Sequence, residues 1–180
     1  MKHLLLAVLL AAAAALACTP FVTPTGLHVY KSPNGCTSDG QCPFGGPANF
    51  YWAPTREIVL VPGQPLKVAA HETCHGHQHQ VILNETGAEP QPGGPPPSAV
   101  DLHEWLTTTE AAAYLPVVAA ADGGFPAWGR RDTALWLLED FAEACGRFLA
   151  DDPRFPLDPG RAAFFEGMGM RRGSAILLVP

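Results

Sequence analysis

The five residues 71–75, His-Glu-Thr-Cys-His, constrain the fold of this chain more than any other feature. Residues four apart lie on the same face of an α-helix, so His71 and His75 can hold one zinc ion between their imidazole rings. Glu72 is offset by about a quarter of a turn, from which its carboxylate can reach a metal-bound water. The segment therefore predicts a helix that carries two zinc ligands, His71 and His75, and a general base, Glu72.

The residues around this segment favour one continuous helix. Pro65 suits a first helical position, and the chain from there to Leu83 contains no other proline and a single glycine, Gly76. Gly87 is typical of the residue that follows a helix end. Residues 56–61 are mostly β-branched or aliphatic and are followed by Pro-Gly, which predicts a strand directly before the helix.

The N-terminus has the features of an export signal. Lys2 precedes an apolar run over residues 4–17 that is too short to span a membrane comfortably, and the run ends in Ala-Leu-Ala. The next residue is Cys18, so the segment resembles a bacterial lipobox in which Cys18 carries lipid. We expect residues 1–17 to be a signal peptide. The mature protein is then extracytoplasmic, either as a lipid-anchored bacterial lipoprotein or, failing that, secreted or periplasmic.

The five cysteines favour the same compartment. An exported chain rarely leaves a thiol unpaired, and assigning Cys18 to lipid leaves an even number. Cys36 and Cys42 bracket a short polar loop and predict a local disulfide. Cys74 and Cys145 would then be joined across a long stretch of chain.

The mature chain is long enough for one domain with a substantial core. We expect residues 18–50 to form a disulfide-pinned segment with a short strand at 27–30. Residues 51–180 would form the domain that carries the two histidines. The expected fold class is α+β and mostly helical, with a short antiparallel sheet packed on the helix of His71 and a downstream helix that bears a glutamate.

The charge balance argues against nucleic acid as a partner. The chain has 11 Lys and Arg against 17 Asp and Glu, a formal net charge of −6, and its basic residues do not form a cluster. After residue 17 the sequence contains no apolar stretch long enough to span a bilayer. Membrane association is therefore expected only through lipid on Cys18.

A catalytic zinc ion takes three protein ligands and a water. A metzincin-type site would need a histidine ten residues after the first, where this chain has Val81. The remaining candidates are Glu110 and Glu139. Glu110 lies three residues after Thr107, a capping-box pattern that already gives its carboxylate a role at a helix start.

Glu139 lies at the edge of the apolar stripe of a helix predicted to reach about Ala150. If Cys74 is bonded to Cys145, this helix lies beside the helix of His71, and we therefore favour Glu139 over Glu110. Glu143 is one turn further along, where it can accept a hydrogen bond from a zinc-bound histidine.

Residues 71–75 and the segment Glu-Asp-Phe-Ala-Glu-Ala at 139–144 resemble the zinc-binding helices of gluzincin metallopeptidases, in particular the anthrax-lethal-factor-like branch. The resemblance implies a small zincin-like domain in which Glu139 is the third zinc ligand and Glu143 its outer partner. It also implies peptide hydrolysis by a zinc-bound water that Glu72 deprotonates. Tyr114 and His103 are candidates for the oxyanion donor.

Two other functions fit the same residues. A histidine-rich lipoprotein could bind zinc or copper without catalysis, using His71, His75, His77 and His79. Alternatively, the domain could be inactive, its long-range disulfide serving stability alone. The sequence predicts an exported, monomeric zinc metallopeptidase that acts on a peptide or protein, and it leaves the specificity open.

Overall fold

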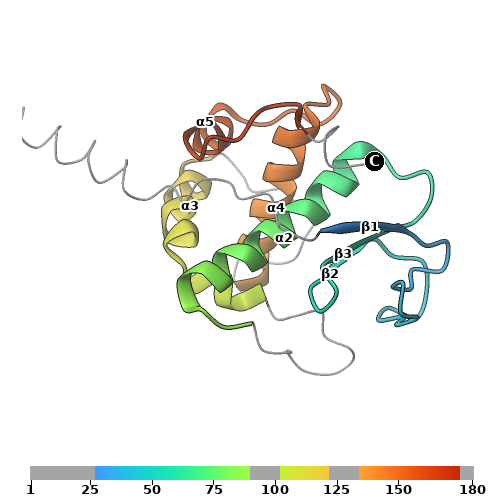
Figure 1. The fold of residues 1–180 in the computed structure, drawn as a ribbon. Helices are drawn as coiled ribbons and strands as arrows, with labels where there is room; N and C mark the ends of the chain where they lie inside the picture. The colour runs from blue at the N-terminus through green and yellow to red at the C-terminus, as the bar shows by residue number, and fades with distance from the viewer. Residues whose placement is uncertain (1–26, 90–101, 122–133, 175–180) are drawn as a thin grey trace, which may run out of the picture.

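The computed structural model describes residues 27–89, 102–121 and 134–174 (Figure 1). Three strands come first: β1 (His28–Lys31), β2 (Phe50–Trp52) and β3 (Glu57–Leu60). They are followed by α2 (Leu66–Thr86), the 3₁₀ helix η1 (Leu102–Thr107), α3 (Thr109–Ala120), α4 (Ala134–Ala150) and α5 (Pro159–Gly167). The fold is α+β and mostly helical, as predicted. The expected signal peptide and Cys18 lie outside the described residues.

Helix α2 is the central element (Figure 1). Most of its residues are buried, because the sheet covers one side while α4 and η1 cover others. It begins after Pro65 and ends at Gly87, whose φ of 70° is a left-handed conformation that glycine adopts without strain. The predicted helix is confirmed and extends slightly beyond Leu83.

The sheet is mixed, so the prediction of an antiparallel sheet was wrong for one strand pair. Its strand order is β1-β3-β2, with β2 antiparallel to β3 and β1 parallel to β3. A short turn joins β2 to β3, which makes an antiparallel hairpin. Residues 32–56 separate β1 from β3, and that length allows the crossover that a parallel pair needs.

The segment before residue 50 belongs to the same sheet. The expected boundary between residues 50 and 51 falls inside β2, and β1 pairs with β3 along its whole length. The predicted Cys36–Cys42 disulfide is formed. Hydrogen bonds join the loop closed by this disulfide to β3. The Glu57 carboxylate accepts one from the backbone N–H of Ser38, at 3.0 Å, and another from the Ser38 hydroxyl.

Helix α3 begins differently from the prediction. Thr108, not Thr107, is the N-cap, and its hydroxyl oxygen accepts a hydrogen bond from a backbone N–H in the first turn. Glu110 does not reach back to the cap. Its carboxylate lies 2.7 Å from Nε2 of His77 and accepts a 2.8 Å hydrogen bond from Nε1 of Trp105. The prediction of a capping box at Thr107 and Glu110 was therefore wrong. The buried side chains of His77 and Trp105 cannot reach water and need Glu110 as an acceptor, whereas a backbone N–H at a helix start can be hydrated.

A buried polar network joins α3, α4 and α5. The Arg161 guanidinium donates to both oxygens of Asp140, at 3.0 and 2.8 Å, and the Tyr114 hydroxyl donates to Asp140 at 2.7 Å. Asp158 caps the N-terminus of α5, accepting a hydrogen bond from the Arg161 backbone N–H at 2.9 Å. The network holds α4 from the side away from α2, since breaking a buried ion pair of this kind costs about 3–5 kcal/mol.

Candidate metal centre

Helices α2 and α4 pack in opposite directions and bring the predicted site residues together. The predicted disulfide between Cys74 and Cys145 joins them, with 6.2 Å between the two Cα atoms. His71 and His75 come from α2, and Glu139 comes from α4. The long-range pairing expected from the number of cysteines is therefore formed at this helix–helix contact.

Three possible ligand atoms converge between these helices. Nε2 of His71 lies 3.1 Å from Nε2 of His75, and Oε2 of Glu139 lies 3.4 Å from the first and 3.6 Å from the second. Tetrahedral zinc with bonds of about 2.0–2.1 Å places its ligand atoms about 3.3–3.4 Å apart. The three observed separations bracket this value, so the residues fit a zinc ion with little rearrangement.

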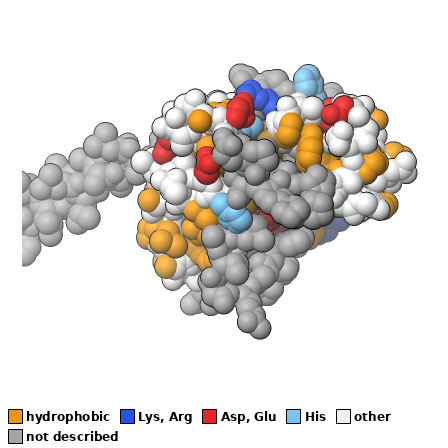
Figure 2. All heavy atoms as spheres, turned by 90° about the horizontal axis from the view of Figure 1, so that it is seen from below, with side chains coloured by type: hydrophobic (Ala, Val, Ile, Leu, Met, Phe, Trp, Pro, Cys, Tyr) orange, Lys and Arg blue, Asp and Glu red, His pale blue; other side chains and the backbone are white. Residues whose placement is uncertain are grey.

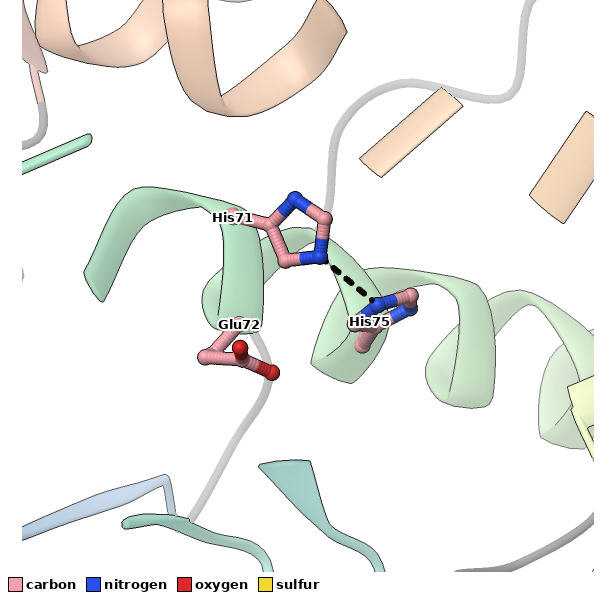
Figure 3. Close-up of side chains that lie close together, drawn as sticks. All are labelled: His71, Glu72 and His75. Atoms are coloured by element: carbon pink, nitrogen blue, oxygen red, sulfur yellow. Dashed lines mark hydrogen bonds between the residues drawn. The ribbon is translucent and has the colours of Figure 1, made fainter. Parts of the chain in front are cut away.

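Glu72 lies beside the two histidines without being bound to them. The ligand atoms of His71, Glu72 and His75 are all within 4.8 Å of one another. In Figure 3 one nitrogen of each imidazole ring points toward the other ring, and the Glu72 carboxylate lies below them on the side of the strands. Oε2 of Glu139 lies 3.4 and 3.6 Å from the two Nε2 atoms, so Glu139 as well as Glu72 is a candidate for the third ligand. Within the described part of the chain, the buried Glu72 carboxylate accepts no hydrogen bond.

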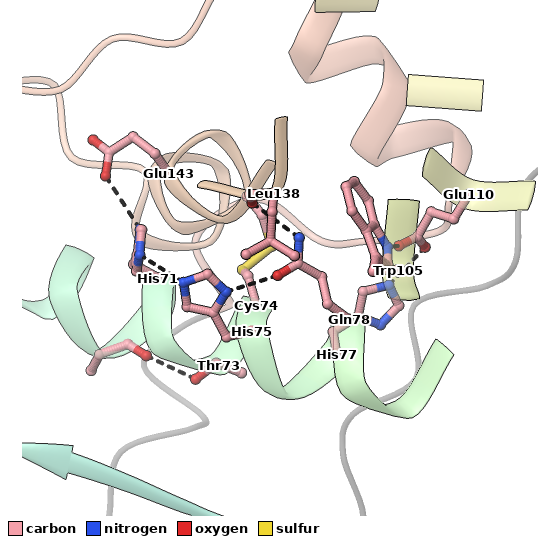
Figure 4. The surroundings of a disulfide bond; sticks show 12 residues. His71, Thr73, Cys74, His75, His77, Gln78, Trp105, Glu110, Leu138 and Glu143 are labelled. Carbon is pink, nitrogen blue, oxygen red and sulfur yellow. Dashed lines mark hydrogen bonds and ion pairs between the residues drawn. A yellow bond between two sulfur atoms is a disulfide. The ribbon is translucent and has the colours of Figure 1, made fainter. Parts of the chain in front are cut away.

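The other nitrogen of each ring faces a polar partner (Figure 4). Nδ1 of His71 lies 3.4 Å from Oε2 of Glu143, and Nδ1 of His75 lies 2.8 Å from Oε1 of Gln78. Both partners can only accept at these oxygens, so each Nδ1 carries a proton, which leaves Nε2 as the atom through which each ring would bind a metal ion. Metal-bound histidines typically donate from the other ring nitrogen to such a partner, and a metal ion at Nε2 would displace any proton held there.

The carboxylates make this region favourable for a cation. Burial lowers the pKa of His71, but hydrogen bonds to Glu139 and Glu143 outweigh it and raise the pKa to about 10. Burial raises the pKa of Glu139, but hydrogen bonds from His71 and His75 hold it well below its ordinary value. The pKa of Glu143 is lowered to about 2, because its bonds to His71, Lys67 and Arg147 outweigh burial. Both carboxylates are therefore anionic at neutral pH.

Glu143 is held in place from two directions. Nζ of Lys67 lies 2.8 and 3.0 Å from its two oxygens, and Nε of Arg147 donates to Oε1 at 2.8 Å. Lys67 is one turn before His71 on α2, and Arg147 is one turn after Glu143 on α4. Neither residue was predicted from the sequence, although both i,i+4 spacings are visible in it.

The other two histidines of α2 point elsewhere. His77 is buried against Glu110, as described above, and its ring stacks on Phe141. Nδ1 of His79 lies 2.9 Å from the hydroxyl of Tyr51, and its Nε2 lies 2.8 Å from Glu89. His77 lies two residues after His75 and therefore points to nearly the opposite side of α2. His79 lies one turn after His75 on the same face, but its two ring nitrogens contact Tyr51 and Glu89.

The structure gives no role at this site to the other candidates. Glu110 is engaged by His77 and Trp105, and the Tyr114 hydroxyl is bound to Asp140 and Arg161. Burial beside the Asp140 carboxylate raises the pKa of Tyr114 well above its ordinary value, so the phenol stays neutral. His103 is exposed on η1.

Gly146 allows α4 to lie directly against α2 at His71. A Cβ at Gly146 would lie 2.8 Å from the backbone nitrogen of His71 and 2.9 Å from its Cα. These are backbone atoms of a packed helix, so relieving the overlap requires the two helices to separate. The sequence offered no signal for this position beyond a glycine in a helical stretch, next to Cys145.

Gly146→Ala should therefore destabilise the protein. We expect the free energy of unfolding to fall by about 1–2 kcal/mol, because the steric overlap outweighs the helix propensity gained by alanine. Urea unfolding followed by circular dichroism measures this change. Gly46→Ala is the matched control, since its Cβ would meet nothing within 4 Å, and it should change stability by less than about 0.5 kcal/mol. A Gly146→Ala protein as stable as wild type would show that the helices are not in tight contact.

The surface drawn in Figure 2 is mixed in character. Small clusters of hydrophobic side chains are interspersed there with acidic, basic and histidine side chains. The described Lys and Arg side chains do not form an extended basic patch on that face. No helix among the described residues is long and apolar enough to cross a bilayer.

Comparison of the chain with protein-family models, with curated proteins and with solved structures gave no match. The function must therefore be inferred from the site itself.

Proposed function

We propose that this protein is an exported zinc-dependent metallopeptidase with a gluzincin-like site. The proposal is carried by the convergence of Nε2 of His71, Nε2 of His75 and Oε2 of Glu139 at separations of 3.1–3.6 Å. Two imidazoles and one carboxylate are a ligand set typical of catalytic zinc, which keeps a fourth position open for water. The strand β3 leading through a short turn into α2, with α4 supplying the glutamate, supports the zincin-like interpretation.

The roles of the residues follow from their positions. When bound, zinc would supply Lewis acidity, making water acidic near neutral pH and polarising a peptide carbonyl. Glu72 lies beside the ligand set with a carboxylate that accepts no hydrogen bond among the described residues. It can therefore take a proton from water and deliver it to the leaving amine. Glu143 orients His71 from the far side of the ring.

The non-catalytic alternative, a histidine-rich protein that sequesters zinc or copper, is less well supported. It needs His77 and His79 as additional metal ligands. Both side chains are buried, and their ring nitrogens are hydrogen-bonded to other residues. A storage site also gives no reason for the buried Glu72 carboxylate, beside the histidine pair, to accept no hydrogen bond from the described residues. Export, as a lipoprotein through Cys18 or by secretion, remains part of the proposal and is supported by the two disulfides.

Metal analysis of natively purified protein tests the ligand set. Wild type should contain about one zinc per chain. We expect Glu139→Ala to weaken zinc binding by more than about 100-fold. Replacing a residue that only hydrogen-bonds to a metal ligand typically weakens metal binding by about 10–100-fold. Glu110→Ala should retain the zinc but lose about 3–5 kcal/mol of stability, because His77 and Trp105 lose their buried acceptor.

Competition with a zinc chelator and urea unfolding measure these two quantities separately. The pair of variants serves as its own control, since both remove a buried or half-buried glutamate near α2. Zinc loss in Glu110→Ala together with zinc retention in Glu139→Ala would contradict the assignment. Wild-type protein that binds no zinc under any condition would contradict the proposed function.

A further inference from the structure

Gln78 is fully buried one turn after His75, at 0% exposure, in a position where an apolar side chain would pack at lower cost. Its amide makes two hydrogen bonds. Oε1 lies 2.8 Å from Nδ1 of His75, and Nε2 donates to the backbone carbonyl of Leu138 at 3.0 Å. Figure 4 shows this amide bridging the imidazole ring on α2 and the backbone of α4.

We infer that Gln78 is a positioning residue that sets His75 for metal binding and couples it to the helix of Glu139. The inference rests on the proposed zinc site. Leu138 is the residue directly before Glu139, so the amide that orients one ligand also holds the backbone beside another.

The orientation of the amide follows from its partners. A carbonyl oxygen can only accept, so the NH₂ group of Gln78 must face Leu138 and its oxygen must face His75. Nδ1 of His75 is therefore the donor, and the lone pair of Nε2 faces His71 and Glu139. A purely structural glutamine would satisfy its own polar atoms. This one also selects the tautomer that a ligand needs, as outer partners of metal-bound histidines do.

Two substitutions separate the hydrogen bond that orients His75 from the hydrogen bond that holds Leu138. Gln78→Met keeps the length and volume but removes both hydrogen bonds. Gln78→Glu restores an acceptor for His75 without a donor for Leu138. The matched control is Gln80→Met on the same helix, where, among the described residues, the amide donates to the side chain of Asn84 and not to a histidine.

We expect Gln78→Met to bind zinc about 10–100-fold more weakly than Gln80→Met. Its Co²⁺ complex should show an altered visible d–d spectrum, because a rotated imidazole changes the coordination geometry. Gln78→Glu should recover about tenfold of the lost zinc affinity and the wild-type Co²⁺ spectrum. In metal-free form it should still lose about 1–3 kcal/mol of stability, from the unpaired Leu138 contact. Chelator competition, cobalt spectroscopy and urea unfolding provide the three readouts.

Equal zinc affinity and equal Co²⁺ spectra in Gln78→Met and Gln80→Met would overturn the inference and leave the zinc site standing. The same conclusion follows if Gln78→Glu binds zinc no better than Gln78→Met. If Gln78→Met does not fold, Gln78→Asn replaces it. The asparagine side chain is one methylene shorter, so its amide cannot reach both His75 and Leu138. Wild-type protein that binds neither zinc nor Co²⁺ would overturn the proposed function, and this inference with it.

Discussion

Glu72→Gln should abolish peptide hydrolysis while the protein keeps about one zinc per chain. Glutamine has nearly the shape of glutamate but cannot take a proton from water at neutral pH. Removing a positioned general base typically lowers the rate by about 10²–10⁴-fold. The Glu72 carboxylate accepts no hydrogen bond among the described residues, so the substitution leaves no buried donor without its partner.

Mass spectrometry of a synthetic peptide library, incubated with each purified protein, measures hydrolysis whichever peptide sequence the protein prefers. Glu166→Gln on α5 is the control, because Glu166 is exposed and its ion-pair partner is Arg172, away from the site. Its activity should equal that of wild type. Undiminished cleavage by Glu72→Gln would show that Glu72 is not the base, and loss of zinc from this variant would make it a ligand instead.

Removing the Cys74–Cys145 disulfide should disturb the zinc site more than removing Cys36–Cys42. Cys74 lies between His71 and His75 on α2, and its partner on α4 follows Glu139 and Glu143. The sequence separations are 71 and 6 residues, for which loop entropy predicts stability losses of about 4 and about 2 kcal/mol.

The paired alanine variants are compared by chelator competition and by urea unfolding. The Cys74→Ala, Cys145→Ala protein should release zinc at a lower chelator concentration than the Cys36→Ala, Cys42→Ala protein. Each variant controls for the other, since each removes one disulfide. Equal zinc retention in the two would mean that the other contacts between α2 and α4 hold Glu139 beside His71 without the disulfide. Peptide mapping without reduction checks that both pairs form in the purified protein.

The features that depend on local geometry could be predicted from the sequence. Helix α2 follows from Pro65, Gly87 and the helix formers between them, and the placement of His71 and His75 on one face follows from the pitch of any α-helix. Neither feature depends on the rest of the chain. The strand β3 was predicted for the same kind of reason, from an apolar run closed by Pro-Gly.

Other predictions failed or stayed open because they depend on contacts between distant segments. Thr107 and Glu110 have the spacing of a capping box, yet Glu110 turns inward to His77 and Trp105. The parallel pairing of β1 depends on the path of the long connection between β1 and β3, which no local pattern encodes.

By itself, the sequence determined the helix of residues 71–75, the shared face of its two histidines and the pairing of four cysteines by number and spacing. Only the tertiary structure decided that Glu139, 64 residues after His75, approaches the two rings while Glu110 does not. The physical reason is one of range. The pitch of a helix fixes the relative positions of side chains only a few residues apart, whereas the position of α4 against α2 depends on how the core packs. That packing includes the absent Cβ of Gly146 and the amide bridge of Gln78, and sequence spacing reveals neither.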